Sequence, residues 1–468
     1  MVFSSLMFLF VFLPMTLVLY YLVPKPLKNP VLILCNLIFY AWETPQYLVL
    51  MLFSVVFNYC AGLELDDLHQ QGKTKAAKWV MIAVVVMNLF LLGFFKYSGF
   101  LVENLNHIPG VALTAAKVAL PVGISFYTFQ VLSYVFDVYR QNVPVQRNFV
   151  LFATYVTFFP KLVSGPIVAY KDMEAQLRER TVSLDQICGG ATLFLTGLFK
   201  KVLIADNLGV LYASISGQSG TMSVVTAWLG AIGYTLQLYF DFSGYSDMAI
   251  GLGRMFGFDI DKNFDYPYLS KSITEFWRRW HISLGKWFRD YVYFPLGGSR
   301  VRTTKILRNL LIVWLLTGIW HGAAWTFVFW GLLHGLAQVL EKFPLRSLRE
   351  KIPDWVNWLV TMLIVNFGWV FFAAPSLGSA LHWIGQMFHS AAGFVDGTAL
   401  YYLGANWPLL LIAIIGCTPW PKLVGANFAG GKGVGTKAVS VAVYGLLLVS
   451  CVASMISATY STFLYFQF

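Results

Sequence analysis

Residues 310–340 read LLIVWLLTGIWHGAAWTFVFWGLLHGLAQVL and contain no formally charged side chain. About 20 apolar residues are enough for a helix to cross the hydrocarbon core of a bilayer, and this stretch exceeds that length. A membrane-spanning helix is therefore expected here, with the ionisable side chain of His321 near its middle. The small residues beside this histidine are Gly318, Gly322, Ala323 and Ala324.

His321 is a candidate functional residue, because ionisable groups are costly at membrane depth and usually face a cavity or the interior of a helical bundle. The small neighbours would let a second helix or a substrate approach closely. Imidazole can take up and return a proton near neutral pH, which suits activation of a hydroxyl or thiol. A buried histidine bonded to a carbonyl is the alternative. His334 falls on another face of the same predicted helix, and we expect it to be structural or to support residues of the site.

The composition of the whole chain indicates a membrane protein. Of the 468 residues, 58% are hydrophobic and 12% are charged, whereas soluble domains contain about 25% charged residues. The five cysteines form no CxxC pair, and no histidine or cysteine spacing is typical of a metal site, so we expect no metal. The expected partners include a lipid bilayer and no nucleic acid.

Apolar stretches long enough to span a bilayer recur along the chain, and we expect about 11 of them. Several are short or interrupted by proline, which predicts re-entrant segments beside the full spans. The predicted fold class is an all-α, polytopic integral membrane protein. Lys25 and Lys28 follow the first stretch, so the positive-inside rule places that loop in the cytoplasm and the N-terminus outside it. The predicted spans lie near residues 3–23, 31–62 (two helices, broken at Pro45), 79–100, 119–138, 149–169, 187–211, 224–240, 310–336, 355–373, 405–418 and 438–458.

The segment from Lys271 to Arg308 concentrates positive charge, with nine basic residues against two acidic ones. It should therefore face the cytoplasm. Residues 273–291 fit one amphipathic helix, in which His281 shares the apolar face with tryptophans. Two interpretations stay open: an anchor helix on anionic lipid, or a basic mouth that gathers an anionic donor substrate. A satisfied structural histidine is likewise an alternative for His281.

A polar cluster lies in residues 237–247 (QLYFDFSGYSD), within an otherwise apolar region. Two carboxylates in such surroundings need hydrogen-bonding or charged partners. A structural hydrogen-bond network and the lining of a cavity are both compatible with this pattern. The candidate residues are Gln237, Tyr239, Asp241, Ser243, Tyr245 and Asp247.

Three runs of sequence resemble the membrane-bound O-acyltransferase (MBOAT) family, and within it the bacterial polysaccharide O-acetylation branch. They are QLYFDFSGYSDMAIGLG (237–253), NFDYPYLSKSITEFWRRWHISLGKWFRDYVYFPLGG (263–298) and TGIWHGAAWTFVFWGLLHG (317–335). The runs PVGISFYTFQVLSYVFDVYR (121–140) and FFPKLVSGPI (158–167) are similar to the same branch. The resemblance extends to about residue 375 and becomes weaker beyond it.

The resemblance implies one membrane domain over residues 1–468, with a catalytic core near 120–340 and late spans in 355–468. It implies helices arranged in a ring around a central cavity and tunnel. It also implies acetyl transfer from a cytoplasmic thioester, with acetyl-CoA as the expected donor and no bound cofactor. The acetyl group would cross the inner membrane to a periplasmic, SGNH-like acetyltransferase partner, and a polysaccharide of the alginate or cellulose type would be the final acceptor.

The family's two signature polar positions fall on His281, in the WRRWHISL context, and His321, in the TGIWHG context. By this resemblance His321 would be the general base, and His281 would position the donor or assist the proton transfer. Residues that would bind the donor are Trp277, Arg278, Arg279 and Lys286. Three alternatives remain: D-alanyl transfer from a carrier protein to an envelope polymer, proton-coupled transport without acyl chemistry, and a scaffold for the assembly of a complex. Residues 376–437 resemble nothing that indicates a role.

Overall fold

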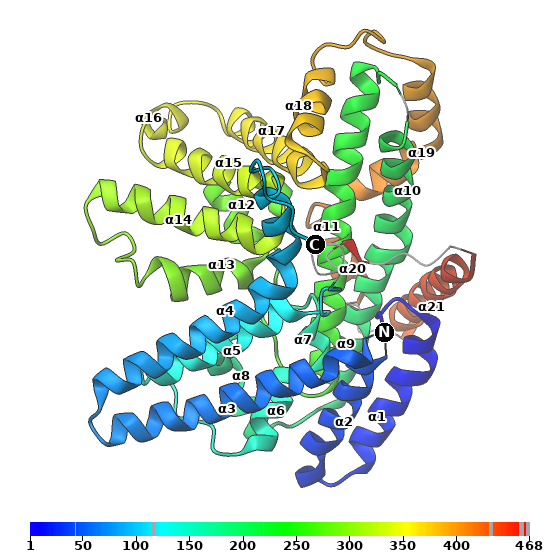
Figure 1. Cartoon of the computed structure of the whole chain (residues 1–468). Helices are drawn as coiled ribbons and strands as arrows, with labels where there is room; N and C mark the ends of the chain where they lie inside the picture. The colour runs from blue at the N-terminus through cyan, green and yellow to red at the C-terminus, as the bar shows by residue number, and fades with distance from the viewer. Residues whose placement is uncertain (43, 115–117, 219, 430–433, 458–462, 465–468) are drawn as a thin grey trace. The chain divides into compact units, whose positions relative to one another are not determined.

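The computed structural model describes residues 1–42, 44–114, 118–218, 220–429, 434–457 and 463–464 (Figure 1). Helices and the turns between them make up these residues, and no strand occurs among them. The all-α prediction is confirmed. The chain divides into two compact units, one of Met1–Phe194 with Met248–Asp261, the other of Leu195–Asp247 with Lys262–Phe468.

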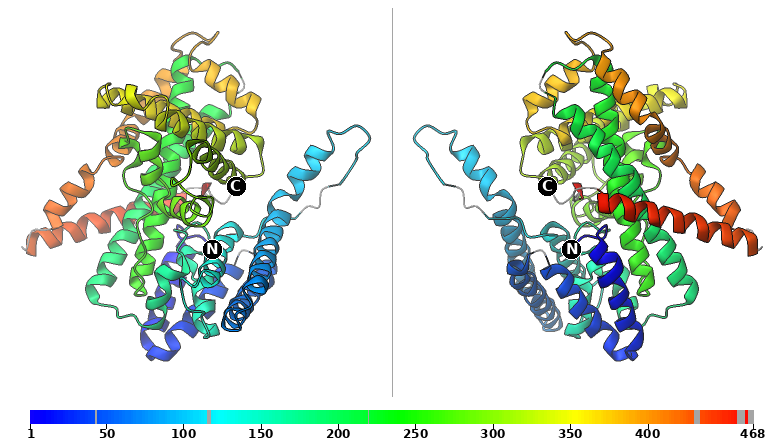
Figure 2. Two further views of the ribbon diagram at one scale, coloured as in Figure 1. Left: turned by 90° about the vertical axis from the view of Figure 1, so that its left-hand side faces the viewer. Right: turned by 90° about the vertical axis from the view of Figure 1, so that its right-hand side faces the viewer.

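The first unit is a bundle in which α3 and α4 run antiparallel and side by side (Figure 2). Asn58 and Asn88 join these two helices through reciprocal amide hydrogen bonds of 3.1 and 2.9 Å. Such pairs bind helices together where little water competes. The helices of this unit are α1 (Leu13–Leu22), α2 (Lys28–Ala41), α3 (Leu48–Gln70), α4 (Thr74–Leu105), α5 (Ile124–Tyr139), α6 (Phe149–Thr157), α7 (Phe159–Leu162), α8 (Tyr170–Arg178) and most of α9 (Leu184–Phe199).

The second unit contains both candidate histidines and most of the later helices. A π-helical segment, Lys200–Ala205, connects α9 to α10, and α11 contributes its residues up to Asp247. The helices are α10 (Asp206–Ser216), α11 (Val224–Met255), α12 (Ile273–Arg279), α13 (Ile282–Phe288), α14 (Thr303–His321), α15 (Trp325–Lys342), α16 (Arg346–Arg349), α17 (Asp354–Ala373), α18 (Leu377–Gln386), α19 (Gly397–Gly416), α20 (Trp420–Ala429) and α21 (Val434–Ser457).

Residues 310–336 do not form one span, and the prediction of a single helix here is wrong. The chain turns between His321 and Trp325, so that α14 and α15 form a hairpin. Glycines allow the two helices to touch: a Cβ atom on Gly318 would lie 2.5 Å from the Phe327 carbonyl oxygen, and one on Gly331 only 2.4 Å from that of Trp314. His321 therefore ends α14, and His334 lies on a different helix.

The continuous helix predicted over 273–291 is also wrong. It is broken at Trp280 and His281, between α12 and α13, and His281 adopts the left-handed region with φ of 44°. The residues around the break bond to another segment instead: the amide of Asp265 donates to the Arg279 carbonyl oxygen, and that of Ile282 to the Asn263 carbonyl oxygen, both at 2.9 Å. The expected burial of Trp280 and His281 nevertheless holds.

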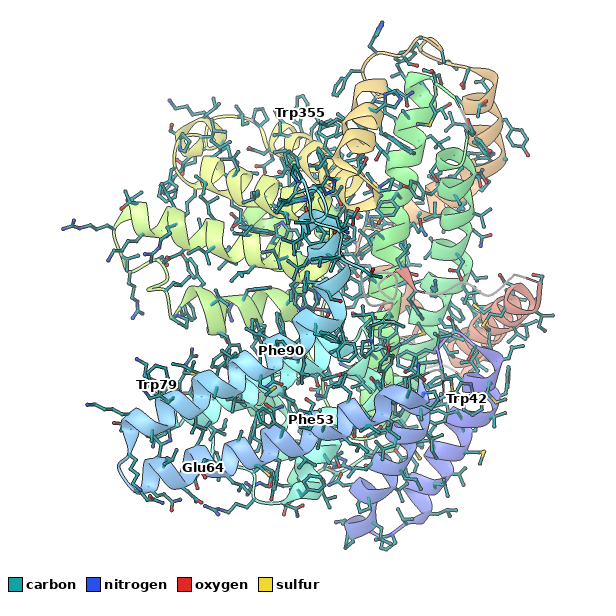
Figure 3. All side chains as sticks on the ribbon, viewed as in Figure 1. Trp42, Phe53, Glu64, Trp79, Phe90 and Trp355 are labelled. Atoms are coloured by element: carbon teal, nitrogen blue, oxygen red, sulfur yellow. The ribbon has the colours of Figure 1, made fainter. Side chains whose placement is uncertain are left out.

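In the part of the chain that the structure describes, six helical segments are long and apolar enough to cross a membrane: Pro45–Gln70, Thr74–Leu105, Leu184–Ser216, Asp354–Ala373, Gly397–Gly416 and Ala438–Ser457, with Phe8–Leu22 as a shorter apolar helix. Some of the other predicted stretches form shorter pieces; residues 149–169, for example, are divided between α6 and α7 at Phe158. The stretch at 224–240 instead belongs to a longer helix, α11. Large apolar side chains cover the outer faces, among them Trp79 at 70% and Phe90 at 63% exposure (Figure 3). This surface suits lipid.

Candidate active site

His321 is buried at the C-terminal end of α14, with 5% of its surface exposed. Its Nδ1 atom lies 2.7 Å from the backbone carbonyl oxygen of Thr317. Because a carbonyl oxygen can only accept a hydrogen bond, Nδ1 carries the proton in the neutral ring. Nε2 is then the nitrogen that can accept a proton, which is the state a general base requires.

Aromatic rings enclose this imidazole. The ring centroid of Trp330, on α15, lies 4.8 Å from that of His321, and the Phe372 ring, on α17, lies 5.6 Å away in an edge-on arrangement. These walls keep water from the imidazole, and in a dry site an imidazole favours its neutral form.

His281 is buried at the break between α12 and α13, with 1% exposure. Its Nδ1 atom lies 3.2 Å from the Oδ1 atom of Asn263, and the ring of Phe242 packs against it at 4.7 Å. Burial, and secondarily the repulsion that a proton on His321 would add, holds the pKa of the His281 imidazole well below its usual value of 6.5. His281 is therefore neutral at physiological pH.

Trp320 connects the two histidines. Its ring centroid lies 5.0 Å from that of His321 and 6.3 Å from that of His281. The structure thus brings together two side chains that were predicted on separate helices and that form the centre of the candidate site. Two neutral imidazoles in an apolar setting can accept, hold and return protons.

Trp277 lies against His334 in a second aromatic group. Its indole N–H donates to His334 Nδ1 at 3.3 Å. Trp314 stacks on His334 at 5.5 Å, and its own N–H donates to Gln338 Oε1 at 3.0 Å. This group is continuous with the first, because Trp330 lies 5.3 Å from His334 as well as beside His321. The structural role predicted for His334 agrees with these contacts.

The basic candidates occupy different surroundings. Arg279 is held by Glu275 at 2.7 Å and by the Asp265 carbonyl oxygen at 3.3 Å, so much of its bonding capacity is used within the fold. Arg278 is exposed, and Lys286 is half-buried. Of the predicted donor-binding residues, Arg278 is thus the most accessible to an anionic ligand, and donor binding by this set stays a prediction.

The polar cluster at 237–247 meets two lysines that were not singled out from the sequence. Lys201 Nζ lies 2.7 Å from Asp241 and 2.6 Å from Asp206, and Lys200 Nζ lies 2.6 Å from Asp247. Both lysines interrupt an apolar run at 187–211, and that interruption is the signal that could have identified them. These ion pairs agree with the structural-network reading of the two carboxylates.

The remaining members of the cluster are also largely enclosed. Tyr239, Ser243 and Tyr245 are each at most 3% exposed. The backbone N–H of Leu464 donates to Asp241 Oδ2 at 3.0 Å, and the ring of Phe463 lies 4.6 Å from Lys201 Nζ. Gln237 packs against Gly209: a Cβ atom added to Gly209 would lie 2.7 Å from the Nε2 atom of Gln237. Cavity lining by these residues stays a prediction.

Comparison with protein families identifies this arrangement. The profile of the MBOAT, membrane-bound O-acyltransferase family, matches residues 33–379. The chain belongs to this family. As a member of the membrane-bound O-acyltransferase family, it is an O-acyltransferase and a multi-pass membrane protein. Both histidines lie inside the matched range, whereas α19, α20 and α21 lie outside it.

This MBOAT chain is similar in sequence to three enzymes that have different names. It is 42% identical to the "Probable alginate O-acetylase AlgI" of Pseudomonas putida over 492 residues, covering 100% of both chains. It is 38% identical to the "Peptidoglycan O-acetyltransferase" of Helicobacter pylori, over 81% of this chain and 78% of the relative. It is 29% identical to the "Teichoic acid D-alanyltransferase" of Streptococcus thermophilus, over 48% of this chain and 58% of the relative.

Several residues of the candidate site in this MBOAT chain were not predicted from the sequence. Asn263, Trp320 and Trp330 contact the two histidines, yet none was singled out. No regular hydrophobic periodicity extends over the whole stretch from Asn263 to His281, so the sequence pattern could not predict that these two side chains meet. Trp330 was assigned to the same helix as His321, whereas the hairpin turn brings it back against the imidazole.

Proposed function

We propose that this protein transfers acetyl groups from a cytoplasmic thioester, acetyl-CoA, for the O-acetylation of an extracytoplasmic polysaccharide. The observation that carries the proposal is the hydrogen bond from His321 Nδ1–H to the Thr317 carbonyl oxygen at 2.7 Å. It directs the basic nitrogen of a buried imidazole away from its own helix backbone. Relatives named as O-acetylases of alginate and of peptidoglycan support acetyl as the group transferred.

The reaction step follows from the chemistry of a thioester and a hydroxyl. His321 Nε2 accepts the proton of the acceptor hydroxyl while its oxygen attacks the thioester carbonyl carbon. The tetrahedral intermediate then collapses, the carbon–sulfur bond breaks, and the thiolate recovers the proton from His321. The products are an ester and a free thiol, and no net proton is consumed.

His281 has a supporting role in this proposal. Its imidazole is neutral and adjoins His321 through Trp320. Because its Nδ1 atom bonds to Asn263 Oδ1, its Nε2 atom can accept one hydrogen bond at the reacting groups, and thereby position them or assist the proton transfer. Arg278, Arg279 and Lys286 would attract the phosphates of the donor from the cytoplasmic side.

The proposed setting is the inner membrane of a bacterium, with the N-terminus in the periplasm. Loops rich in Lys and Arg face the cytoplasm, and the basic segment that contains Arg278 is one of them. Transfer through the membrane protein avoids moving an anionic donor across the bilayer, which is costly because charges are strongly disfavoured there. A periplasmic SGNH-like partner would complete the transfer to an alginate-type polymer.

Acetyl transfer is favoured over D-alanyl transfer by the relatives. The two O-acetylase relatives match over at least 81% of the chain, whereas the D-alanyltransferase matches over 48%. The alternative predicts a different donor, an aminoacylated carrier protein. Competition between acetyl-CoA and such a carrier distinguishes them directly.

The test is thioester turnover by the purified protein in lipid nanodiscs supplied with radiolabelled acetyl-CoA. Wild type is compared with His321→Ala and His281→Ala, and with His107→Gln, which alters an exposed histidine outside the site. We expect turnover in wild type and His107→Gln and its loss in the other two. Unchanged turnover in a well-folded His321→Ala protein would contradict the proposal. Turnover only with an aminoacylated carrier would replace acetyl by D-alanyl.

A further inference from the structure

Asn263 is buried, with 1% exposure, directly behind His281. Its Oδ1 atom lies 3.2 Å from His281 Nδ1 and accepts hydrogen bonds from the backbone N–H of Ser283 at 3.0 Å and from the Ser283 hydroxyl at 2.9 Å. Its backbone carbonyl oxygen accepts from Ile282 at 2.9 Å. One residue thus contacts both the histidine ring and the first residues of α13.

The orientation of the Asn263 amide is fixed by its partners. The backbone N–H of Ser283 can only donate, so the atom that faces it must be the oxygen. The amide nitrogen points the other way and donates to the hydroxyl of Ser246, on α11, at 3.1 Å. Because Oδ1 can only accept, the His281 nitrogen that faces it must carry a proton. His281 therefore has the Nδ1–H tautomer, and Nε2 is its proton-accepting nitrogen.

We infer that Asn263 is a positioning residue for the acyl-transfer reaction, which fixes the tautomer and the direction of the His281 ring. This inference rests on the proposed function, because it assigns His281 a part in the reaction. The left-handed conformation of His281 supports it: a residue other than glycine with φ of 44° is uncommon and costs free energy. Two hydrogen bonds that Asn263 accepts hold His281 in that conformation. One comes from the His281 ring to the Asn263 side chain, and the other comes from the backbone N–H of Ile282 to the Asn263 carbonyl oxygen.

Side-chain variants of Asn263 can distinguish a role in positioning His281 from a merely structural role. Its backbone carbonyl bond to Ile282 remains whatever the side chain is, so the start of α13 keeps that anchor in any variant. Asn263→Asp retains an oxygen that accepts from His281 and Ser283 but adds a negative charge. Asn263→Leu has a similar size but removes the acceptor. The titratable group that, after burial, lowers the pKa of His281 is His321, because protons on both imidazoles would repel each other.

The experiment measures acetyl transfer by nanodisc-reconstituted protein as kcat, KM and a pH profile. We expect Asn263→Leu to reduce kcat at least about 10-fold with little change in KM, as for other residues that orient a histidine. Asn263→Asp should move the acidic limb of the profile to higher pH, because a nearby anion favours the imidazolium. The control, Asn36→Leu, removes a buried asparagine of the other unit that bonds to Thr157 and Phe159, and should leave both quantities unchanged.

A spectroscopic readout covers the case in which Asn263→Leu does not fold. Solid-state NMR of wild type with 15N-labelled histidine in proteoliposomes, assigned by His281→Gln, should give the Nδ1–H tautomer for His281. An Nε2–H tautomer, or wild-type kcat in a folded Asn263→Leu protein, would overturn the inference. If His281→Ala abolishes turnover while Asn263→Leu does not, only this inference fails. If His281→Ala and His321→Ala are both active, the proposed function and this inference about Asn263 both fail.

Discussion

The Nδ1 atom of His321 lies 2.7 Å from the carbonyl oxygen of Thr317, one turn earlier in α14. The bond is made by the backbone and needs no partner side chain. It gives the imidazole one defined tautomer at the very end of a helix, where the last carbonyls lack partners within the helix. The proton-accepting nitrogen is set by helix geometry alone.

Replacement of His321, the proposed base, should abolish most of the activity without unfolding the protein. His321→Gln keeps a polar side chain of similar reach but cannot accept a proton at neutral pH, so kcat should fall by about 10²–10⁴-fold. Thr317→Val is the matched control, because the bond to His321 uses the backbone oxygen and the Thr317 hydroxyl bonds to Val313 instead. The kcat of Thr317→Val should stay within about 3-fold of the wild-type value. A large loss in Thr317→Val would show that the side chain matters.

The stability of the protein should depend on the protonation of His281. The pKa of this buried imidazole lies well below 6.5 in the folded state, whereas the unfolded chain binds a proton near pH 6.5. Below that pH the unfolded state holds more protons, so stability falls as the pH decreases from 6.5 toward the folded-state pKa, by at most about 1.4 kcal/mol per pH unit. Above pH 6.5 the effect is absent.

Thermal unfolding in nanodiscs between pH 5 and 8 measures this dependence. His281→Gln should reduce the fall in Tm on the acid side, with a remainder from His334, whose pKa burial lowers to about 3. His107→Gln, at an exposed site, should leave the fall intact. An equal slope in all three proteins would mean that other groups control acid stability.

The lysine of the buried ion-pair cluster should be important for stability. Lys201 is 2% exposed and lies within 2.7 Å of both Asp241 and Asp206. Lys201→Met leaves two carboxylates without their cation, which should destabilise the protein by about 3–5 kcal/mol. Lys201→Met combined with Asp241→Asn should recover part of this loss, because one of the uncompensated charges is removed.

The matched control is an exposed ion pair of the same unit. Arg346 and Glu350 lie 3.1 Å apart, with side chains 74% and 65% exposed, and Arg346→Met should cost less than about 1 kcal/mol. Chemical or thermal unfolding of the reconstituted proteins gives the comparison. Equal effects of the two substitutions would contradict the structural role of the cluster.

The α14–α15 hairpin should not tolerate a methyl group at its closest contact. In Gly331→Ala the Cβ atom would lie 2.4 Å from the Trp314 carbonyl oxygen, so the two helices must separate and His321 must shift from Trp330. We expect a lower Tm together with reduced kcat. Gly385→Ala, at a helical glycine with nothing within 4 Å of the added atom, should be neutral or slightly stabilising. Indistinguishable behaviour of the two variants would refute this packing.

The exposed arginine of the basic segment should act on donor binding and not on chemistry. Arg278→Gln should raise the KM for acetyl-CoA with kcat unchanged, because an attraction to phosphate is equal in the ground state and the transition state. The increase should diminish at high salt, where exposed charges are screened. Arg346→Gln, outside the segment, is the control, and an unaltered KM in Arg278→Gln would remove this residue from the donor site.

Much of the fold could be predicted because the bilayer constrains it strongly. Apolar length predicted the helix over 355–373, which is observed as Asp354–Ala373, and Pro45 correctly divided 31–62. The hairpin at 310–340 was missed because Gly322–Ala324 are apolar, and hydropathy cannot distinguish a turn of small residues from a continued helix. Close approach at Gly318 and Gly331 is visible only once the helices are paired.

The candidate site was predicted in part, for a similar reason. The two histidines were identified, each on its own segment, because an ionisable side chain is unusual in an apolar setting and because their sequence contexts resemble those of the family. The chain breaks at His281, and the positive φ of this non-glycine residue is imposed by tertiary contacts and not by local sequence. Asn263 and Lys201 act through partners distant in sequence, His281 and Asp241, so no local pattern could predict their roles.

The hairpin of α14 and α15 is one contiguous stretch, and this has a consequence for biosynthesis. Its two helices are complete before the ribosome has translated α17, so the bond between His321 and Thr317 and the contact with Trp330 can form during membrane insertion. Phe372 and Trp369 arrive later and close the aromatic wall. His321 thus acquires its tautomer first and its enclosure second, and an arrested nascent chain ending before α17 would expose the imidazole that the finished protein conceals.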